Sequence, residues 1–525
     1  GRRLNPSEKP QTKYLAEERA GWQVPKRQRS RIESSIRSES WPLLQLRRRR
    51  APRRQEITAA STWQCLALIV RQSFLMRRSA ILFFALIALL RGATAAEPRP
   101  EAILVVVADQ HSAYERTAQF VAHIDRLRAG NPGVPFAVLI DGDALEFGNV
   151  VARRTAGTVD FALFAALAQR APTVINLGNH EPEFHDVPET VKRLQAAGLT
   201  VISGNLRDRA TGKPFAPASA RLKLGAHDAV IVGVTTDWLD TYRVAIRPQI
   251  SPAAPAAWAT ENFPALLKGA PLPIVLSHAG LAADREMLPL VPDGTLFAGA
   301  HDHLRFVHRA GRTVYFHSGS WMSHLSVARL YRTGGALQWE LDQVPLRADD
   351  PADPALAKLI RETLARHLTA EELAVVGRTP RALSPDDAAR FAVEAARRAA
   401  SADAAIVGAT TFGAGLPAGE VTRFALDACV RFDGTLWYAD VSGMAMNGYL
   451  TRANRGPDTP LADRSGENLI AAVSPGEFVP ERRYRLVVTD WIARNAQKYL
   501  GHFPPEFREM PELKLKSAAI EALKN

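Results

Sequence analysis

The sequence predicts an α/β protein, because short apolar runs alternate with stretches of helical periodicity from about residue 100 to residue 341. The runs are rich in β-branched residues and are followed by polar residues or Gly, which is typical of buried strands that end in loops. Five such runs precede polar segments: Ile103–Ala108, Phe136–Ile140, Val174–Leu177, Ile274–Ser277 and Thr295–Ala298. Amphipathic helices are expected between them, for example at Thr117–Arg128 and Thr190–Ala197.

The end of this region is rich in expected strands, at Thr313–Phe316, Val327–Tyr331 and Leu337–Leu341. The polar, Pro-containing segment 349–354 is the predicted domain boundary. The predicted organisation is a first domain at 100–345, a linker at 346–367 and a second domain at 368–525. The second domain is read as α+β from these elements: a helix at Ser384–Ala400 and strands at Ala404–Val407, Thr435–Val441 and Tyr484–Val488. Its helix has Ser384 as the expected N-cap, followed by Pro385.

The basic charge of the chain belongs to its first part. The whole sequence has a formal net charge of +12, but residues 1–95 hold 20 of the 66 Lys and Arg and only 6 of the 54 Asp and Glu. Residues 96–525 therefore hold 46 basic and 48 acidic residues. This near-balance argues against a nucleic acid polymer as the partner of the folded body.

Residues 76–95 have the pattern of a signal peptide. The segment Met76–Ser79 is basic, Ala80–Leu90 is apolar, and Ala93-Thr94-Ala95 is a small-x-small cleavage signal. The apolar run is too short for a membrane span of about 20 residues, and no Cys follows it directly, so no stable membrane anchor is expected. We expect export, with the mature protein periplasmic or secreted after cleavage near Ala95. Residues 1–75 are interpreted as a non-native or disordered upstream segment, the alternative being an Arg- and Ser-rich targeting extension.

Polar side chains follow the five apolar runs, and the carboxyl ends of strands are where open α/β sheets bind ligands. Seven of these side chains are candidate metal ligands: Asp109, His111, Asp143, Asn179, His278, His301 and His303. Carboxylate, amide and imidazole ligands without thiolate suit Zn, Mn, Fe or Co. Seven are too many for one tetrahedral ion, so we expect two divalent ions that share a carboxylate, as in enzymes that clamp a phosphoryl group.

The order of these segments resembles that of the calcineurin-like metallophosphoesterases. The motif Gly178-Asn179-His180-Glu181 is similar to the corresponding motif of their 5′-nucleotidase branch. The resemblance continues through Ser203–Leu206 and Gly233–Thr236 and into Ala402–Gly443, so that it covers about 100–515. It implies a four-layer α/β/β/α metallophosphoesterase sandwich, a bridging helix within Pro354–His367, and a smaller α+β C-terminal substrate-binding domain.

The resemblance also implies roles for the candidate ligands. One ion would be held by Asp109, His111, Asp143 and His303, and the other by Asp143, Asn179, His278 and His301, with Asp143 shared. His180 would lie beside the phosphate as a catalytic residue, paired with an acid. The family position of that acid falls on Glu183, but the local sequence departs from the family, and Asp186 is the alternative if residues are inserted.

The second domain departs from the family in its substrate loop. The Arg that clamps the substrate in the nucleotidases falls on Gly413, and the Asn before it falls on Gly408. Trp491 aligns with one base-stacking aromatic and Tyr499 with the end of a family signature, so both are candidate substrate-binding residues. The second stacking ring is expected near 468–470, where the sequence has none. A Trp in such a position is also a common core residue.

The sequence therefore predicts an exported phosphoesterase that hydrolyses nucleotides, of the 5′-nucleotidase or 2′,3′-cyclic nucleotide phosphodiesterase type, with metal-activated water. One alternative is the same core acting on a non-nucleotide ester, such as a sugar phosphate or a thiosulfonate-type substrate. The other is an exported binding protein without turnover. In each case the partner is a small molecule.

Overall fold

The computed structural model describes residues 99–465, 468–501 and 503–524. Residues 1–75, interpreted as an upstream segment, and residues 76–95, interpreted as a signal peptide, lie outside these described ranges. Residues 96–525 cluster as one compact unit. Within the described ranges, the structure contains no helix with the length and apolar character needed to cross a membrane.

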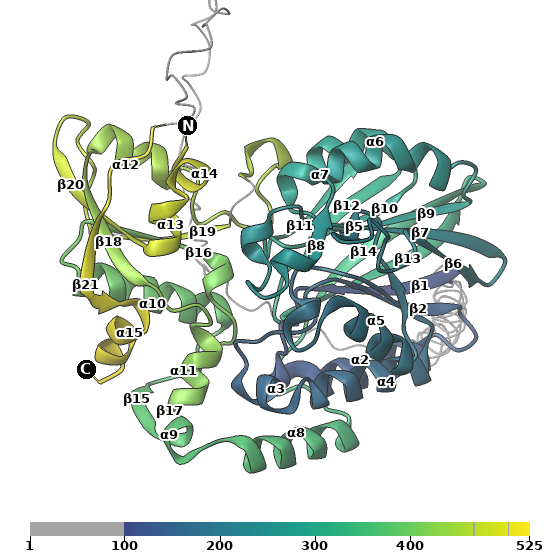
Figure 1. Cartoon of the computed structure of the whole chain (residues 1–525), viewed down its shortest axis with the longest axis horizontal. Helices are drawn as coiled ribbons and strands as arrows, with labels where there is room; N and C mark the ends of the chain where they lie inside the picture. Colours follow the sequence, from purple (N-terminus) through teal and green to yellow (C-terminus); the bar gives the residue numbers. More distant parts are fainter. Residues whose placement is uncertain (1–98, 466–467, 502, 525) are drawn as a thin grey trace, which may run out of the picture. The chain divides into compact units, whose positions relative to one another are not determined.

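The first domain is built on two six-stranded sheets (Figure 1). The first sheet has the strand order β14 (Ala336–Pro345), β13 (His324–Thr333), β1 (Ala102–Ala108), β2 (Phe136–Asp141), β3 (Thr173–Asn176) and β4 (Thr200–Ile202). The second has the order β11 (Arg305–Ala310), β12 (Thr313–Ser318), β10 (Leu296–Gly299), β9 (Leu272–His278), β7 (His227–Thr235) and β6 (Ser219–Leu224). A small ribbon pairs β5 (Leu206–Asp208) with β8 (Ile250–Pro252).

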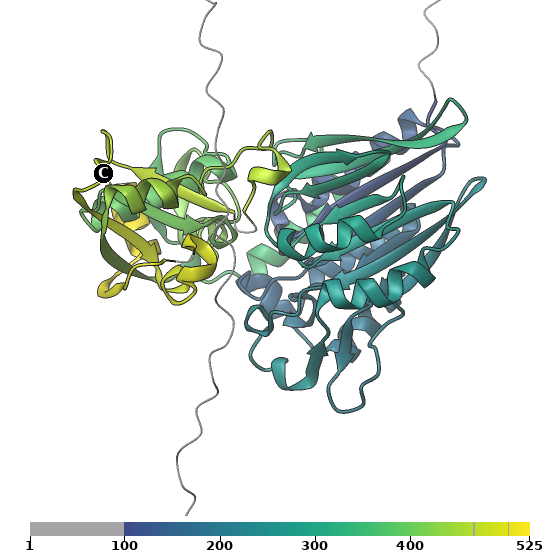
Figure 2. The ribbon, with the colours of Figure 1, turned by 90° about the horizontal axis from the view of Figure 1, so that it is seen from above.

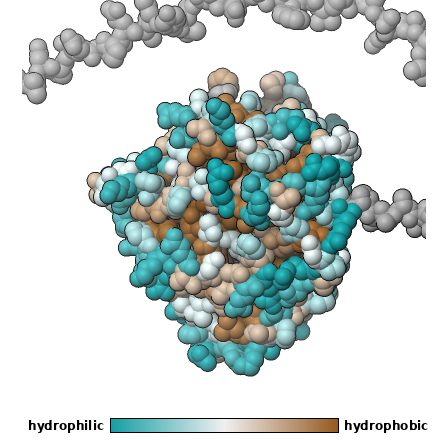
Figure 3. Space-filling view, turned by 90° about the vertical axis from the view of Figure 1, so that its right-hand side faces the viewer, coloured by the Kyte–Doolittle hydropathy of each residue, from teal (hydrophilic) through white to brown (hydrophobic). Residues whose placement is uncertain are grey.

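Helices cover the outer faces of both sheets (Figure 1, Figure 2). The helices of the first domain are α2 (Tyr114–Gly130), α3 (Val150–Thr155), α4 (Thr158–Arg170), α5 (Val187–Ala196), α6 (Pro255–Leu266) and α7 (Leu281–Met287). One apolar cluster joins α2, α4 and α5 to the first sheet, one lies between the two sheets, and one joins α6 and α7 to the second sheet. These three cores separate four layers, which confirms the predicted α/β/β/α sandwich. On the face seen in Figure 3, hydrophilic side chains predominate, with apolar side chains between them.

Helix α8 (Pro354–His367) spans the residues expected for the bridging helix. Asp353 caps its N-terminus by accepting a hydrogen bond from the backbone N–H of Leu356, and Pro354 fills the first helical position. The helix packs on α2, α3 and α4 of the first domain. The short helix α9 (Ala370–Leu373) follows and contacts α11 (Arg423–Cys429), so the linker runs along the first domain before it reaches the second.

The second domain contains a five-stranded sheet with the order β19 (Leu469–Val473), β16 (Ala404–Gly408), β20 (Arg483–Thr489), β18 (Thr435–Ser442) and β21 (Arg508–Lys514). In the chain, β16 is flanked by β15 (Val375–Thr379) and β17 (Gly419–Thr422), which pair with each other in a separate two-stranded sheet. One face of the large sheet packs against α10 (Pro385–Ala399) and α15 (Leu515–Lys524). The other packs against α12 (Gly443–Leu450), α13 (Asp490–Arg494) and α14 (Ala496–Leu500). Ser384 caps α10 as predicted.

Candidate metal centre and substrate cavity

Parallel strands bring the candidate metal ligands to one edge of the sandwich. In the first sheet, the last residues of three neighbouring parallel strands are in register: Ala108 with Asp141, and Asp141 with Asn176. In the second sheet, β9 ends at His278 beside Thr235 of β7, and β10 is its parallel neighbour on the other side. The loops that leave these strands therefore start side by side, as the sequence predicted.

The backbone of these loops is held in the left-handed region at five of the seven candidate ligands. The φ angles are 48° at Asp109, 51° at His111, 51° at Asp143, 78° at His301 and 55° at His303. Non-Gly residues rarely adopt positive φ, and such strain is concentrated at functional sites. The loops thus adopt a backbone conformation of higher energy, in which these side chains converge on a common point.

The first cluster of candidate ligands contains Asp109, His111 and His303. The Nε2 atoms of the two histidines lie 2.9 Å apart, and Oδ1 of Asp109 lies 3.9 Å from Nε2 of His111 and 3.7 Å from Nε2 of His303. All three side chains are almost fully buried. Two imidazole nitrogens and a carboxylate oxygen that converge in this way form the donor set of a divalent metal site.

The second cluster contains Asp143, His278 and His301. Oδ2 of Asp143 lies 2.9 Å from Nε2 of His278. Nδ1 of His278 is 2.8 Å from the backbone carbonyl of Asp141, and a hydrogen bond there leaves Nε2 directed at the cluster. The amide nitrogen of Asn179 donates to the carbonyl of Thr241 at 3.1 Å, which leaves its Oδ1 without a hydrogen-bond partner and available as a ligand.

The chemistry of these groups fits divalent metal ions. Oδ1 of Asn179 is a buried polar atom without a hydrogen-bond partner. Burial and the charge of His278 lower the pKa of His301 to about 3, and burial and His111 hold the pKa of His303 well below its usual range. Both imidazoles are therefore neutral, which is the form that binds metal. Burial opposes ionisation of Asp143, but His278 and His180 outweigh it and hold the pKa of Asp143 well below its usual range.

His180 lies beside the two clusters and is paired with Glu183. Nδ1 of His180 is 2.7 Å from Oε1 of Glu183, whereas Asp186 caps helix α5 by accepting a hydrogen bond from the backbone N–H of Glu189. The structure therefore brings Glu183, rather than Asp186, to the imidazole. Burial disfavours a charged His180, but the carboxylates of Asp143, Glu146 and Glu183 raise its pKa well above its usual range.

Glu146 is a buried acid at this site that was not among the residues predicted from the sequence. Its Oε2 lies 3.2 Å from Nδ1 of His111 and 3.9 Å from Nδ1 of His180. Burial raises the pKa of Glu146, but His180, a hydrogen bond from His111 and the charge of Arg431 together lower it to about 2. Glu146 is three residues after Asp143, so its place in the ligand-bearing loop was the available signal.

The candidate ligands and the candidate substrate-binding residues share one cavity of about 380 Å³. From the first domain it is lined by His111, Asp143, Asn179, His180, His301 and His303, and from the second by Trp491 and Tyr499. Asp109 and His278 lie behind this lining, fully buried. The indole N–H of Trp491 donates to the hydroxyl of Tyr499 at 2.8 Å, which fixes the two side chains relative to each other.

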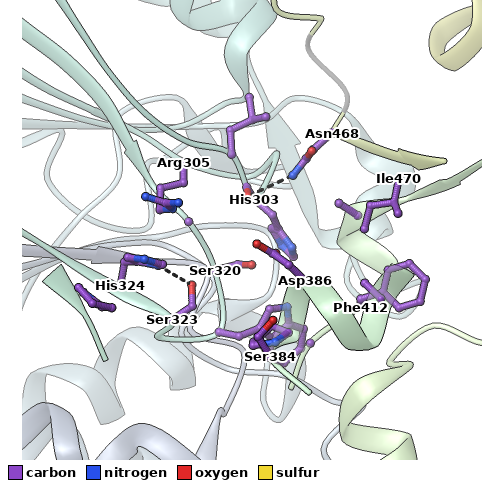
Figure 4. A pocket seen from close by; sticks show the side chains of 18 of the residues that line it. His303, Arg305, Ser320, Ser323, His324, Ser384, Asp386, Phe412, Asn468 and Ile470 are labelled. Atoms are coloured by element: carbon purple, nitrogen blue, oxygen red, sulfur yellow. Dashed lines mark hydrogen bonds between the residues drawn. The ribbon is translucent and has the colours of Figure 1, made fainter. Parts of the chain in front are cut away.

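A larger cavity of about 810 Å³ lies beside His303 (Figure 4). His303 is the only one of the predicted site residues that lines it. The side chain of Asn468 donates a hydrogen bond to the carbonyl of His303 at 3.4 Å, and Asn468 lines both cavities. Because the metal-ligand clusters open into the smaller cavity, the smaller cavity is the candidate active site.

The aromatic partner of Trp491 comes from the first domain. The ring of Trp238 lies 5.3 Å from that of Trp491, centroid to centroid. The sequence analysis expected a second aromatic ring near 468–470. It did not identify Trp238, because this residue lies in the loop after β7, in the first domain. At Gly413, a Cβ atom would lie 2.6 Å from the carbonyl oxygen of Ala428. The backbone there has no room for the Arg that the family carries at this position.

Comparison with known proteins supports the fold described above. Residues 103–305 match the family model for "Calcineurin-like phosphoesterase", while no curated protein matches the sequence. The 5′-nucleotidase precursor of Thermus thermophilus is 19% identical with a TM-score of 0.54, covering 81% of this chain and 96% of that one.

Two further solved structures share this fold. The Thermus thermophilus sulfate thiohydrolase SoxB, in complex with glycerol, is 16% identical with a TM-score of 0.57, over 81% of this chain and 94% of that one. The 5′-nucleotidase of Candida albicans is 14% identical with a TM-score of 0.53, and the match covers 81% of this chain and 98% of that one. At these identities, the likeness shows a common fold that extends through the second domain.

Proposed function

We propose that the chain, whose residues 103–305 match the calcineurin-like phosphoesterase model, is a metal-dependent phosphoester hydrolase that works with two divalent ions. The observation that carries this proposal is the pair of clusters at one cavity, Asp109–His111–His303 and Asp143–His278–His301. Asp143 lies between them, in contact with His278 and within the reach of His111. In this proposal Asp143 is the shared ligand and Asn179 completes the second site.

Bound metal ions would supply Lewis acidity and a water molecule of lowered pKa. The protein would hold the ligands in place and protonate or stabilise the reacting ester. His180, whose pKa is raised by the neighbouring carboxylates of Asp143, Glu146 and Glu183, lines the cavity that the ester would enter. Its N–H is suited to stabilise charge on the phosphoryl oxygens or to protonate the leaving group.

Nucleotides are the first candidate substrates. We also propose that the protein is exported and hydrolyses them outside the cytoplasm. The support is the likeness to 5′-nucleotidase structures in both domains and the presence of Trp491 and Tyr499 on the cavity wall. The signal-peptide pattern at 76–95 supports export.

The second candidate is a non-nucleotide ester hydrolysed by the same core. Two observations favour it: Gly413 has no room for the family's Arg, and Trp238 packs on the ring expected to stack a base. The solved sulfate thiohydrolase shows that the same fold is found in a protein of another substrate class.

The test is the activity of the purified protein after loading with Mn, Zn, Fe or Co. The panel contains adenosine 5′-monophosphate, 2′,3′-cyclic AMP, p-nitrophenyl phosphate and a sugar phosphate. Two ions per chain and hydrolysis are expected. Faster hydrolysis of the nucleotides than of the aryl phosphate would favour the first candidate, and equal or slower hydrolysis would favour the second. Two bound ions without turnover of any ester would contradict the proposal and indicate a binding protein.

A further inference from the structure

A buried cation of the second domain, Arg431, lies next to the candidate metal centre. It comes just after helix α11 in the chain and is only 9% exposed. Its Nε and Nη2 atoms are buried without a hydrogen-bond partner. The guanidinium lies instead over the ring of Trp321, a residue of the first domain, at 4.9 Å from the ring centroid. Burying a charge in this way costs folding free energy, so the position of Arg431 calls for an explanation beyond packing.

Trp321 contacts the first cluster of candidate ligands. Its ring lies 4.7 Å from the ring of His111, centroid to centroid, with an angle of 30° between the planes, and 6.3 Å from the ring of His303. Its backbone N–H donates to the carbonyl of Asp109 at 2.7 Å. Trp321 is buried, and its φ of 57° shows that the surrounding structure holds it in an unfavourable conformation. It thus has a ring or backbone contact with every member of the cluster.

Arg431 also acts on Glu146, the acid beside His111. Burial lowers the pKa of Arg431, and three carboxylates oppose this effect, Glu146 most strongly. The other two pair with cations of their own: Glu115 with Arg116 at 2.9 Å, and Asp427 with Lys516 at 2.7 Å. Because Oε2 of Glu146 lies 3.2 Å from Nδ1 of His111, Arg431 reaches this candidate ligand by two routes, the ring of Trp321 and the carboxylate of Glu146.

Gly413 leaves the room that this arrangement needs. A Cβ atom there would lie 3.0 Å from Cδ2 of Trp321 and 3.0 Å from Cγ of Arg431. The backbone N–H of Gly413 donates to the carbonyl of Cys429, and that of Arg431 donates to the carbonyl of Thr411, both at 2.9 Å. These bonds join the loop after β16 to the segment that carries Arg431. The side chains of Trp321 and Arg431 therefore lie where the family's Arg side chain would begin.

We propose that Arg431 is a positioning residue for the first metal cluster, and that it acts on His111 through Trp321 and Glu146. This inference goes beyond the proposed function and rests on it, since it needs an ion at this cluster. Arg431 is neither a proposed ligand nor one of the residues that line the active-site cavity. The second domain thus contributes to metal binding as well as to the substrate cavity.

The experiment measures Mn²⁺ binding to the metal-free full protein by isothermal titration calorimetry. Two dissociation constants are expected for the wild type. In Arg431→Met, one of them should rise about tenfold or more and the other by less than about threefold, the scale of losing a residue behind a metal ligand. Arg431→Lys keeps the charge and should restore most of the affinity.

Arg464→Met is the matched control. Arg464 is 3% exposed, its Nε has no hydrogen-bond partner, and its guanidinium lies over the ring of Phe306 at 4.3 Å. That ring packs on Tyr315 and His317 instead of on a candidate ligand. Arg464→Met should therefore lower the urea midpoint but keep both dissociation constants of the wild type.

Two single-site backgrounds assign the effect to one cluster. His278→Ala disables the second cluster and His303→Ala disables the first. Adding Arg431→Met should weaken Mn²⁺ binding about tenfold in the first background and less than about threefold in the second. Trp321→Leu should give the same pattern, and it decides the question if Arg431→Met does not fold. Trp339→Leu, on an equally buried tryptophan between the two sheets, should change the urea midpoint alone.

Three results would overturn the inference and leave the two-ion proposal intact. They are wild-type dissociation constants in Arg431→Met, an equal loss of affinity in both backgrounds, and a loss in Arg464→Met as large as that in Arg431→Met. A wild type that binds fewer than two Mn²⁺ ions would overturn the proposed function and this inference with it.

Discussion

The two walls of the active-site cavity are built in different ways. The wall from the first domain consists of buried side chains at the ends of sheet strands, with the left-handed φ angles of Asp109 and His301 held by the surrounding structure. The wall from the second domain includes exposed rings: Trp491 is 38% exposed and Phe432 is 44% exposed. The first wall, called the metal-binding wall, carries the candidate metal ligands of the motifs that resemble the family. The second, called the recognition wall, has Gly413 behind it at the position of the family's Arg, and its Trp491 lies against Trp238.

The two walls place different demands on their residues. A metal ligand must meet distance and charge requirements at once, and each ligand here depends on the loop geometry of a neighbour. For example, the backbone N–H of His301 donates to Oδ1 of Asp109 at 3.1 Å, and the backbone N–H of His180 donates to Oδ1 of Asp143 at 2.7 Å. A substrate side group needs only a suitable surface, which residues from several loops can provide.

The strongest test of the metal-binding wall is the removal of the shared carboxylate. We expect Asp143→Asn to lose at least one ion and nearly all hydrolysis, because the carboxylate contacts His278 and orders the loop of His180. His301→Ala should behave in the same way. Metal content per chain by mass spectrometry and kcat are the measurements. Two retained ions with near-normal kcat in both variants would contradict the two-ion arrangement.

The next largest effect is expected at His180. His180→Ala should lower kcat by about 10²–10⁴ and keep both ions, because an acid or charge-stabilising group is lost but no proposed ligand is. His180 also lies within a candidate metal cluster with His111 and Asp143, so loss of an ion in this variant would identify it as a ligand. Asp186→Asn is the control, since Asn also caps a helix. It should leave kcat close to that of the wild type.

Substitution of Glu146 tests whether a residue that contacts a candidate ligand, without being one itself, contributes to metal affinity. Oε2 of Glu146 lies 3.2 Å from Nδ1 of His111, where the carboxylate would hold the Nδ1 proton and leave Nε2 for metal. Glu146→Gln has nearly the same shape without the charge, and it should weaken metal binding about 10–100-fold. Titration of the metal-free protein with Mn²⁺ or Zn²⁺ measures this. An unchanged dissociation constant would limit Glu146 to a packing role.

The recognition wall is tested at Gly413. Gly413→Arg should destabilise the protein by about 1–3 kcal/mol, the usual cost of overpacking, because a Cβ there would lie 2.6 Å from the carbonyl oxygen of Ala428. It should not improve the use of nucleotides. Gly408→Ala is the matched control, since the atoms nearest to its Cβ lie at ordinary contact distances of 3.6 and 3.8 Å. Urea unfolding compares the two, and a wild-type midpoint for Gly413→Arg would show that the loop can move.

The smallest expected effect lies outside the cavity, where Arg154 of α3 and Glu372 of α9 form a two-bond ion pair with both distances at 2.7 Å. The hydrogen bond from Arg154 is the largest cause that lowers the pKa of Glu372 to about 2. Because this pKa is depressed in the folded state, the stabilisation is present above the unfolded value of about 4.3 and is lost as the pH falls towards 2.

Glu372→Gln should therefore cost about 0.5–1 kcal/mol at pH 7, the scale of a surface ion pair, and nothing near pH 2. The free energy of unfolding in urea, measured across this pH range for both proteins, checks the sign. A difference that grows towards low pH would contradict it.

Local patterns in the sequence were sufficient to predict the strands that carry the ligands. The apolar run Phe136–Ile140 became β2 (Phe136–Asp141), and Ser384 caps α10 as its position before a Pro indicates. The convergence of the candidate ligands was also predictable, because parallel neighbours end at one edge. Strands of only three residues, such as β5 and β8, escaped prediction since they are too short to show a periodic pattern.

The α/β class, the strand ends and the set of candidate metal ligands can be predicted from the sequence alone, because periodicity and motif order are local properties of the chain. Three contacts become visible in the folded chain: Glu183 lies beside His180, Glu146 lies beside His111, and Trp238 lies against Trp491. Each of these contacts depends on how loops or domains pack, and no short-range pattern encodes the packing of residues from different elements.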